Sequence, residues 1–309
     1  MTTKKLKPDN YAKTMSVRWL AMCALPMLLV FVFNYLPMFG AIIAFKDYKY
    51  NLGILGSPWV GFENFKFFFK SDVFVRITWN TIKFNLIFIV GSTIGAIIVA
   101  LFLYQVSGRG RTKVFQTILI TPHFMSWVVV ASMAYAILQP SSGFLNTILM
   151  SVGLKLVNWY GEPKVWTPIL TTAYLWKTIG MDSIMYYAAL MGIDSTYYEA
   201  ASIDGAGRFR TMRSIILPSL VPLILTLSIL KVGNIFRADF GLFYQLPRNI
   251  GTLYEATDVV DTYIYRSMRE VGDMGMSSAI GLLQSVVGFI MVMLTNHVSK
   301  KIDSDSGLF

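Results

Sequence analysis

The chain alternates long apolar stretches with short polar connections. A helix needs about 20 apolar residues to cross the hydrocarbon core of a bilayer. Six stretches reach that length, so the pattern predicts an all-α polytopic membrane protein with six transmembrane helices. The predicted spans are Leu20–Phe45, Asn80–Val106, Val114–Leu138, Trp166–Met191, Ile215–Arg237 and Met276–Val298.

Prolines interrupt the first, third and fifth of these stretches. Pro26 and Pro37 lie in the first, Pro122 in the third, and Pro218 and Pro222 near the start of the fifth. Because proline has no N–H to donate, we expect kinks or breaks at these positions. Such breaks are tolerated in membranes where neighbouring helices satisfy the freed backbone groups.

Composition supports the membrane class. Of the 309 residues, 55% are hydrophobic and 14% are charged, and the mean hydropathy is +0.55. Soluble domains carry roughly 25% charged residues. The net charge of +10 would suit a nucleic-acid partner, but the basic residues lie at the ends of apolar stretches, where topology signals belong. We therefore expect no nucleic-acid partner.

The distribution of Lys and Arg predicts the orientation. Basic residues gather in the N-terminal tail, in the turn after the second span, in segment 208–213 and at 300–301. With six spans these four segments fall on one side, so both termini are expected in the cytoplasm. Segment 238–275 falls on the opposite side, with three arginines against six acidic residues. A lysine-rich first outer loop is a weaker counter-signal.

This pattern predicts one membrane domain with two short tails. The tails cover residues 1–19 and 300–309, and the transmembrane domain covers residues 20–299. The domain includes a polar loop at 192–218, between the fourth and fifth spans.

That polar loop carries local signals of a short helix. Thr196 followed three residues later by Glu199 fits a capping box, so a helix is expected to begin at Tyr197. Gly205 fits the left-handed residue that often follows a helix end. A second helix is expected from Ala206 into the fifth span. By themselves these signals describe no more than a rigid, well-capped turn.

Residues 199–218 resemble the EAA signature of the membrane subunits of ABC importers. That signature is Glu-Ala-Ala, then Gly after three residues, then Ile-x-Leu-Pro after nine more. The matching residues, with the aspartate before the glycine, are Glu199, Ala200, Ala201, Asp204, Gly205, Ile215, Leu217 and Pro218. The resemblance implies that this loop docks into a cleft of an ATPase and transmits nucleotide-driven closure to the membrane helices.

Two further segments resemble the carbohydrate branch of these permeases. Segment 34–48 (Asn-Tyr-Leu-Pro-Met-Phe-Gly-Ala-Ile-Ile-Ala-Phe-Lys-Asp-Tyr) and segment 59–65 (Trp-Val-Gly-Phe-Glu-Asn-Phe) are most similar to its LplB-type subfamily. The resemblance implies a type I ABC importer permease fold in a bacterial cell membrane. It also implies import of carbohydrate, with oligosaccharide as the expected substrate.

The resemblance also implies partners. These are a second homologous permease, two ABC ATPase subunits, an extracytoplasmic sugar-binding lipoprotein and membrane lipid. The chain has no Gly-x-x-x-x-Gly-Lys-Ser/Thr sequence, so we expect ATP and magnesium on the ATPase subunits and no cofactor here. With two histidines and one cysteine, no metal site is expected.

Polar and aromatic residues inside the fourth and fifth spans are candidates for the substrate path. Ionisable groups in hydrocarbon cost about 2.5–3.5 kcal/mol each and usually face a cavity or a partner. Lys177 and Asp182 are five residues apart and so point to different helix faces. Asp182 could pair with Lys231 across helices; a salt bridge and a cavity-lining role remain equally good interpretations. The candidates are Tyr174, Trp176, Lys177, Asp182, Lys231, Asn234 and Arg237.

Two alternatives to carbohydrate import remain at this point. The first is a permease for peptides or another solute. The second is a membrane-embedded enzyme of lipid or cell-wall chemistry. Such an enzyme needs a nucleophile–base or metal constellation, and none appears at motif spacing. We therefore expect no enzymatic activity in this chain.

Overall fold

The computed structural model describes residues 10–106 and 108–302. Over those residues the chain is helical and forms no strand, apart from one isolated bridge between Lys46 and Trp59. The predicted all-α class is confirmed. Residues 1–9 and 303–309, which belong to the two predicted tails, lie outside the described residues.

Long helices form the body of the molecule, joined by many short ones. The long helices are α1 (Asn10–Val30), α4 (Asp72–Gln105), α8 (Trp166–Met191), α11 (Leu217–Gly233) and α15 (Met274–Ile302). The shorter α-helices are α2 (Gly53–Gly56), α3 (Glu63–Lys70), α5 (Arg109–Ile120), α6 (Trp127–Leu138), α7 (Phe144–Ser151), α9 (Ser195–Ile203), α10 (Arg208–Thr211), α12 (Phe240–Gln245), α13 (Tyr254–Thr257) and α14 (Val260–Arg266). Turns of 3₁₀-helix are η2 (Leu36–Phe45), η3 (Thr121–Phe124), η4 (Pro163–Val165) and η6 (Gly251–Leu253), and π-turns are η1 (Phe31–Tyr35), η5 (Met212–Ile216) and η7 (Ser267–Val271).

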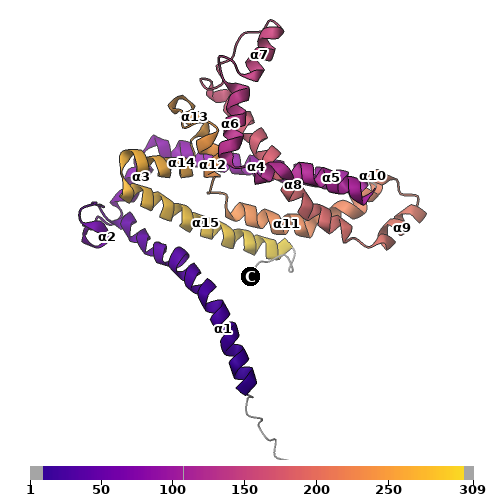
Figure 1. Cartoon of the computed structure of the whole chain (residues 1–309), viewed down its shortest axis with the longest axis horizontal. Helices are drawn as coiled ribbons and strands as arrows, with labels where there is room; N and C mark the ends of the chain where they lie inside the picture. The colour runs from indigo at the N-terminus through magenta and orange to yellow at the C-terminus, as the bar shows by residue number, and fades with distance from the viewer. Residues whose placement is uncertain (1–9, 107, 303–309) are drawn as a thin grey trace, which may run out of the picture.

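Four of the long helices, α4, α8, α11 and α15, run along the long axis of the molecule (Figure 1). Helix α4 packs on α8, α11 packs on α15, and α11 also contacts α4 and α8. Helices α6 and α7 stand out from one side, and α1 from the other. Helix α9 lies at one end, whereas α12, α13 and α14 lie toward the opposite end. The 192–218 loop and the 238–275 segment are therefore at opposite ends of the helix layer.

The multi-pass class is confirmed, but the count of six spans is not. Among the described residues, four helices are long and apolar enough to cross a membrane: Trp19–Phe45, Asp72–Gln105, Arg208–Gly233 and Met274–Val298. A fifth candidate is a pair of helices, Arg109–Phe124 and Trp127–Leu138, bent by 95°. Helix α8 is 26 residues long, but it carries a lysine, an aspartate and four threonines. Its composition alone does not identify it as a span.

The predicted third span, Val114–Leu138, is broken at Pro122, as expected from the proline. Helix α5 gives way to the 3₁₀-turn η3, which contains Pro122, and α6 begins after Ser126, whose hydroxyl caps it. Proline cannot continue the helical hydrogen bonds, so the break falls there. The Lys177 ammonium of α8 donates to the His123 carbonyl at 2.6 Å and satisfies one of the backbone groups at the break.

Small residues let α4 and α8 approach closely. Gly91 and Gly95 lie one turn apart on α4, where Leu175 and Ile179 of α8 cover them. A Cβ at Gly95 would lie 2.5 Å from Ile179 Cδ1, and one at Gly91 would lie 3.1 Å from Leu175 Cδ2. The Gly-x-x-x-Gly spacing is typical of helix contacts in membranes, because it lets backbones come together.

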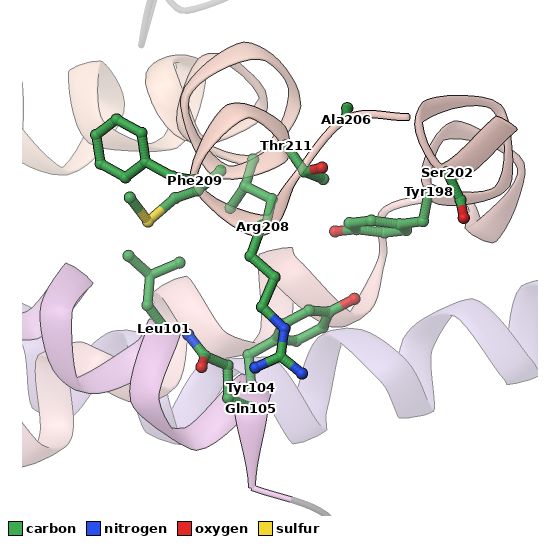
Figure 2. A pocket seen from close by; sticks show the side chains of 11 residues that line it. Leu101, Tyr104, Gln105, Tyr198, Ser202, Ala206, Arg208, Phe209 and Thr211 are labelled. Atoms are coloured by element: carbon green, nitrogen blue, oxygen red, sulfur yellow. The ribbon is translucent and has the colours of Figure 1, made fainter. Parts of the chain in front are cut away.

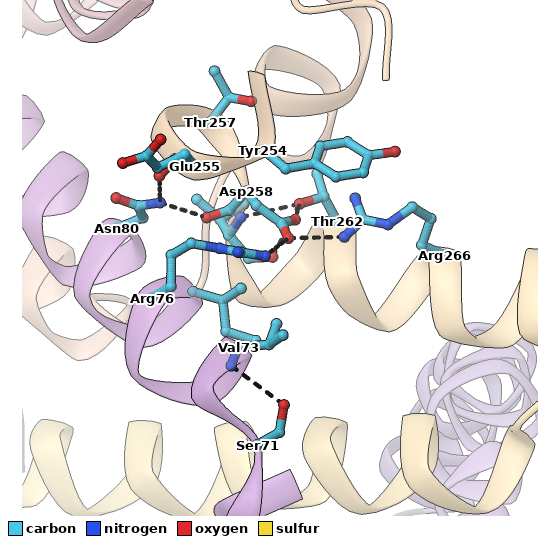
Figure 3. A network of polar contacts seen from close by, with 12 residues as sticks. Ser71, Val73, Arg76, Asn80, Tyr254, Glu255, Thr257, Asp258, Thr262 and Arg266 are labelled. Atoms are coloured by element: carbon cyan, nitrogen blue, oxygen red, sulfur yellow. Dashed lines mark hydrogen bonds and ion pairs between the residues drawn. The ribbon is translucent and has the colours of Figure 1, made fainter. Parts of the chain in front are cut away.

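A buried carboxylate ties the 238–275 segment to the start of α4 (Figure 3). Asp258 is fully buried and accepts from Arg266 at 2.8 Å and from Arg76 at 3.4 Å. The Thr262 hydroxyl donates to its other oxygen at 2.9 Å, and the Asn80 amide donates to its backbone carbonyl at 3.0 Å. We call these five residues the Asp258 cluster. Two of them, Arg76 and Asn80, come from α4, so the cluster joins segments about 180 residues apart in sequence.

Replacing Asp258 with Asn should destabilise the protein. The change leaves the arginines without their buried counter-charge, and breaking a buried ion pair in this way costs about 3 kcal/mol. We expect a clear fall in the thermal unfolding midpoint of the full chain in detergent. The matched control is Asp47→Asn, because Asp47 pairs with Lys49 at 3.6 Å on the exposed surface and should matter little. Equal midpoints for the two variants would contradict the structural role of the cluster.

Candidate functional site

The helix in the 192–218 loop begins earlier than predicted. Asp194, not Thr196, is the N-cap of α9, and its carboxylate accepts from the Thr196 backbone N–H at 3.0 Å. The predicted capping box between Thr196 and Glu199 is therefore wrong. The backbone hydrogen bond from Thr196 lowers the pKa of the exposed Asp194 carboxyl. The cap thus holds its charge where the positive end of the helix favours it.

The corner after α9 matches the prediction. Gly205 has a φ of +69°, the left-handed conformation that side chains rarely adopt. The Ala206 N–H bonds back to the Ala201 carbonyl at 2.9 Å and closes the turn. After Gly207, helix runs without a gap from Arg208 to Gly233, through α10, η5 and α11. The expected second helix leading into the fifth span is confirmed.

The residues predicted for ATPase coupling divide between surface and interior. Glu199, Ala200, Asp204, Gly205 and Pro218 are exposed, Ile215 and Leu217 are half-buried, and Ala201 is buried. Two large apolar side chains of α9 also face outward: Tyr197 is 61% exposed and Ile203 is 87% exposed. An exposed apolar surface of this kind, rimmed by polar groups, suits contact with another protein.

The base of this loop is packed rather than loose. Tyr186 and Leu190 of α8 form a buried cluster with Ile216 and Leu220, and α4 contributes alanines to it. Tyr198 of α9 packs against the same cluster. Helix α9 follows α8 after three residues and is followed in turn by α10 and α11. Displacement of α9 would therefore be transmitted to both α8 and α11.

Four of the predicted substrate-path residues line one cavity. It has a volume of about 290 Å³ and lies between α4, α8 and the end of α11. Tyr174, Lys231, Asn234 and Arg237 line it, together with Asn85, Phe88 and Asp239. The rings of Tyr174 and Phe88 stack at 3.9 Å. The cavity thus combines an aromatic wall with amide, ammonium, guanidinium and carboxylate groups.

Lys231 and Asp182 form the interhelical ion pair that the sequence suggested. The Lys231 ammonium lies 2.7 Å from Asp182 Oδ2 and donates to the Ser92 hydroxyl at 2.8 Å. Each side chain of the pair is about one quarter exposed. Lys231 therefore both pairs with Asp182 and lines the cavity, so the two interpretations left open are compatible. The pair connects α11 to α8, and Ser92 adds α4.

Two predicted residues lie elsewhere. The Lys177 ammonium, besides donating to the His123 carbonyl, stands 5.3 Å from the centre of the Trp127 ring. Lys177 therefore stabilises the helix break, and it does not line the cavity. Trp176 is 45% exposed on the outside of α8, and it too is absent from the cavity wall.

Sequence reasoning missed polar residues on the second span. The Asn85 amide donates to the Ile235 carbonyl at 2.9 Å and to the Arg237 carbonyl at 3.1 Å, so it fixes the end of α11 against α4. Ser92 and Asp239 were missed as well. The available signal was the presence of amide and hydroxyl side chains inside an apolar stretch, since polar groups in membranes seek partners on neighbouring helices.

Comparison with known proteins decides the family. The sequence profile of the binding-protein-dependent transport system inner membrane components matches residues 92–304. The chain belongs to this family. It is 36% identical over 293 residues to Protein LplB of Bacillus subtilis, covering 94% of this chain and 91% of that protein. The LplB-type resemblance is thereby confirmed.

Two further comparisons agree. The polygalacturonan/rhamnogalacturonan transport system permease protein YteP of Bacillus subtilis is 35% identical over 290 residues, covering 94% of this chain and 90% of that protein. A crystal structure of a bacterial alginate ABC transporter, in complex with an alginate pentasaccharide-bound periplasmic protein, matches with a TM-score of 0.83 and 33% identity. That match covers 95% of this chain and 98% of that chain.

Membership of this family sets aside the membrane-enzyme alternative. The chain is a transport component of the ABC importer type and not itself an enzyme. Among the described residues, no three His, Cys, Asp or Glu side chains gather where they could hold a metal ion. The ion pair and the cavity are therefore features of a permease.

Breaking the Lys231–Asp182 pair should cost more than removing it. Lys231→Met leaves a carboxylate unpaired inside the helix layer, at about 2.5–3.5 kcal/mol, whereas Lys231→Met combined with Asp182→Asn removes both charges. We expect the single variant to lose thermal stability in detergent and the double variant to recover most of it. Ser92→Ala is the mild control, because it removes one hydrogen bond worth about 1 kcal/mol. Additive losses in the double variant would show that the two groups do not interact.

Proposed function

We propose that this permease imports carbohydrate, with oligosaccharide as its substrate, as one subunit of an ATP-driven assembly. The single observation that carries the proposal is the exposed α9 corner, by which we mean α9 and the turn at Gly205, joined to α8 and α11, two of the helices that line the cavity. The names of similar proteins support the substrate class: one transports polygalacturonan and rhamnogalacturonan, and another carries alginate. A permease for peptides or another solute is the remaining alternative.

The α9 corner is proposed as the coupling element to an ATPase. Its exposed residues Tyr197, Glu199 and Ile203 combine apolar area with an acid on one short helix. Gly205 fixes the sharp turn that lets α9 project from the end of the molecule. ATP and magnesium would lie on the ATPase subunits, and this chain would contribute the docking helix alone.

The orientation is proposed from charge. The basic residues of segment 208–213 support a cytoplasmic location for the α9 end by the positive-inside rule, with both chain termini on the same side. The opposite end, which carries α12, α13, α14 and the Asp258 cluster, would then face outward. We propose that this outer end meets the sugar-binding lipoprotein. The complex of the alginate transporter with a periplasmic protein supports such a contact.

A second permease subunit completes the proposal. One chain supplies one coupling helix, whereas two ATPase subunits need two. The cavity is open between α4, α8 and α11, and a homologous subunit could supply the opposite wall. The stacked Tyr174–Phe88 pair, with Asn85 and Asn234 beside it, offers the ring face and hydrogen-bonding groups that a sugar requires.

Substitutions at the corner should uncouple ATP hydrolysis from uptake. Gly205→Ala forces a side chain into the left-handed conformation, at roughly 1 kcal/mol, and Glu199→Ala removes the exposed acid. In the full assembly we expect uptake of labelled oligosaccharide to fall about fivefold for each variant, which a change of about 1 kcal/mol in docking would produce. The matched control is Gly207→Ala, since Gly207 has a φ of −69° and open space around it.

The outcome is measured as uptake in cells and as ATPase activity of the purified assembly. Normal uptake with both Gly205→Ala and Glu199→Ala would overturn the coupling role. The substrate class is tested by competition, with unlabelled oligosaccharides and peptides as competitors. Competition by peptides but not by oligosaccharides would contradict carbohydrate import while leaving the coupling role intact.

A further inference from the structure

A cavity larger than the candidate substrate site lies at the root of the 192–218 loop (Figure 2). Its volume is about 630 Å³, and it opens between the C-terminal end of α4 and the segment from α9 to η5. Its walls include Leu101, Tyr104, Tyr198, Arg208 and Met212. It lies at the α9 end of the molecule, away from the residues that line the candidate substrate cavity.

One side of this cavity carries an uncompensated cation. The Arg208 side chain extends from α10 toward Tyr104 and Gln105 at the end of α4 (Figure 2). In the part of the chain that the structure describes, the Arg208 guanidinium has neither a carboxylate partner nor a side-chain hydrogen bond. A guanidinium presents a planar set of donors that matches carboxylate and phosphate oxygens. The ligand that would pair with the Arg208 guanidinium in this cavity is therefore an anion.

Two tyrosine side chains, Tyr104 and Tyr198, stand beside the cation. The rings of Tyr104 and Tyr198 lie 6.2 Å apart. Burial, and then the neighbouring Tyr104, raise the pKa of the Tyr198 phenol. The phenol therefore keeps its proton at physiological pH and adds no negative charge that would repel an anion.

The other side of the cavity is apolar and continues into exposed apolar surface. Leu101, Met212 and Ile216 line it, and Phe209 at its edge is 70% exposed. Exposed apolar side chains continue from there along α4 and α5, for example Phe102, which contacts Phe115 edge to face at 5.7 Å. A small hydrophilic anion would gain nothing from this wall, whereas an acyl chain would lie along it.

The surroundings favour an anionic ligand as well. The connections at this end carry six basic residues in 108–113 and 208–213, against three acids on or beside α9. Basic pockets between membrane helices on the cytoplasmic side are typical binding sites for phosphate-bearing lipid headgroups. Charge, shape and position therefore indicate the same ligand.

We propose that this cavity binds the phosphate headgroup of one anionic phospholipid, with Arg208 as its main contact. The Tyr104 and Tyr198 side chains line the cavity beside the headgroup, and one acyl chain leaves past Leu101 and Phe209 into the bilayer. The lipid fills the space between the end of α4 and the loop that bears α9. It thereby joins the loop to the membrane surface.

Native mass spectrometry of the full chain in a zwitterionic detergent tests this site. Phosphatidylglycerol is titrated against phosphatidylcholine of the same acyl chains, and we expect one phosphatidylglycerol to be retained preferentially. Arg208→Gln should weaken its retention about tenfold, because a charge-assisted hydrogen bond is lost. Arg208→Lys keeps the charge but loses the planar fork, and should weaken retention about threefold. The matched control is Arg210→Gln, the same change of charge at an exposed arginine outside the cavity wall.

Four results would overturn the proposal. Equal retention of phosphatidylcholine in the unsubstituted chain would show that no anion is recognised. Displacement of the lipid by millimolar inorganic phosphate would indicate a site for a free anion. An equal loss in Arg210→Gln would indicate diffuse charge attraction. Retention by the lone chain but not by the complex co-purified from its own cells would show that a partner subunit fills the cavity. None of these readouts depends on the transported solute.

Discussion

The close contact between α4 and α8 is the constraint on which the rest of the structure depends. Lipid tails are as apolar as leucine, so burying apolar side chains does not drive membrane helices together, and packing has to hold them. Gly91 and Gly95 provide it by letting Leu175 and Ile179 approach the α4 backbone. Helix α4 carries two residues of the Asp258 cluster at one end, and α8 leads into α9 at the other. Their contact therefore fixes the distance between the Asp258 cluster and α9.

Polar side chains form hydrogen bonds and an ion pair between these helices at the points where they meet. The Lys231 ammonium, shared between Asp182 and Ser92, joins α11 to both α8 and α4. The Asn85 amide holds the backbone at the end of α11 in the same way. Each group would be costly alone in hydrocarbon and becomes tolerable only when its partners are in place. The candidate substrate cavity lies beside these cross-links, so its walls come from helices whose relative positions are fixed.

The sequence predicts the helices of this protein better than it predicts their ends and breaks. The apolar pattern gave α8 at its observed bounds and both α11 and α15 within about four residues at each end, because the bilayer imposes length and hydropathy directly, but it put the start of α4 at Asn80 instead of Asp72. It placed a break at Pro122 between α5 and α6 but could not give its angle, which is 95° in the structure, where Lys177 bonds the backbone at the break. The wrong N-cap has a similar origin: Asp194, Ser195 and Thr196 are all good caps, and only the path of the chain selects one. The sequence could suggest the Lys231–Asp182 pair. It could not show that Trp176 and Lys177 lie away from the cavity that Lys231 lines.

Pro218, at the end of the 192–218 loop, explains why the helix is irregular between α10 and α11. Pro218 lacks the N–H that would continue a regular helix into α11, and the chain meets this with the π-turn Met212–Ile216. The Leu217 N–H donates to the Met212 carbonyl, and the Ser219 hydroxyl donates to the Ile215 carbonyl at 2.7 Å. The π-turn between α10 and α11 thus follows from the missing N–H of Pro218, and its own hydrogen bonds are formed. A force applied at α9 would reach α11 through helix that is continuous from Arg208 to Gly233, because the π-turn accommodates the missing Pro218 donor without a gap.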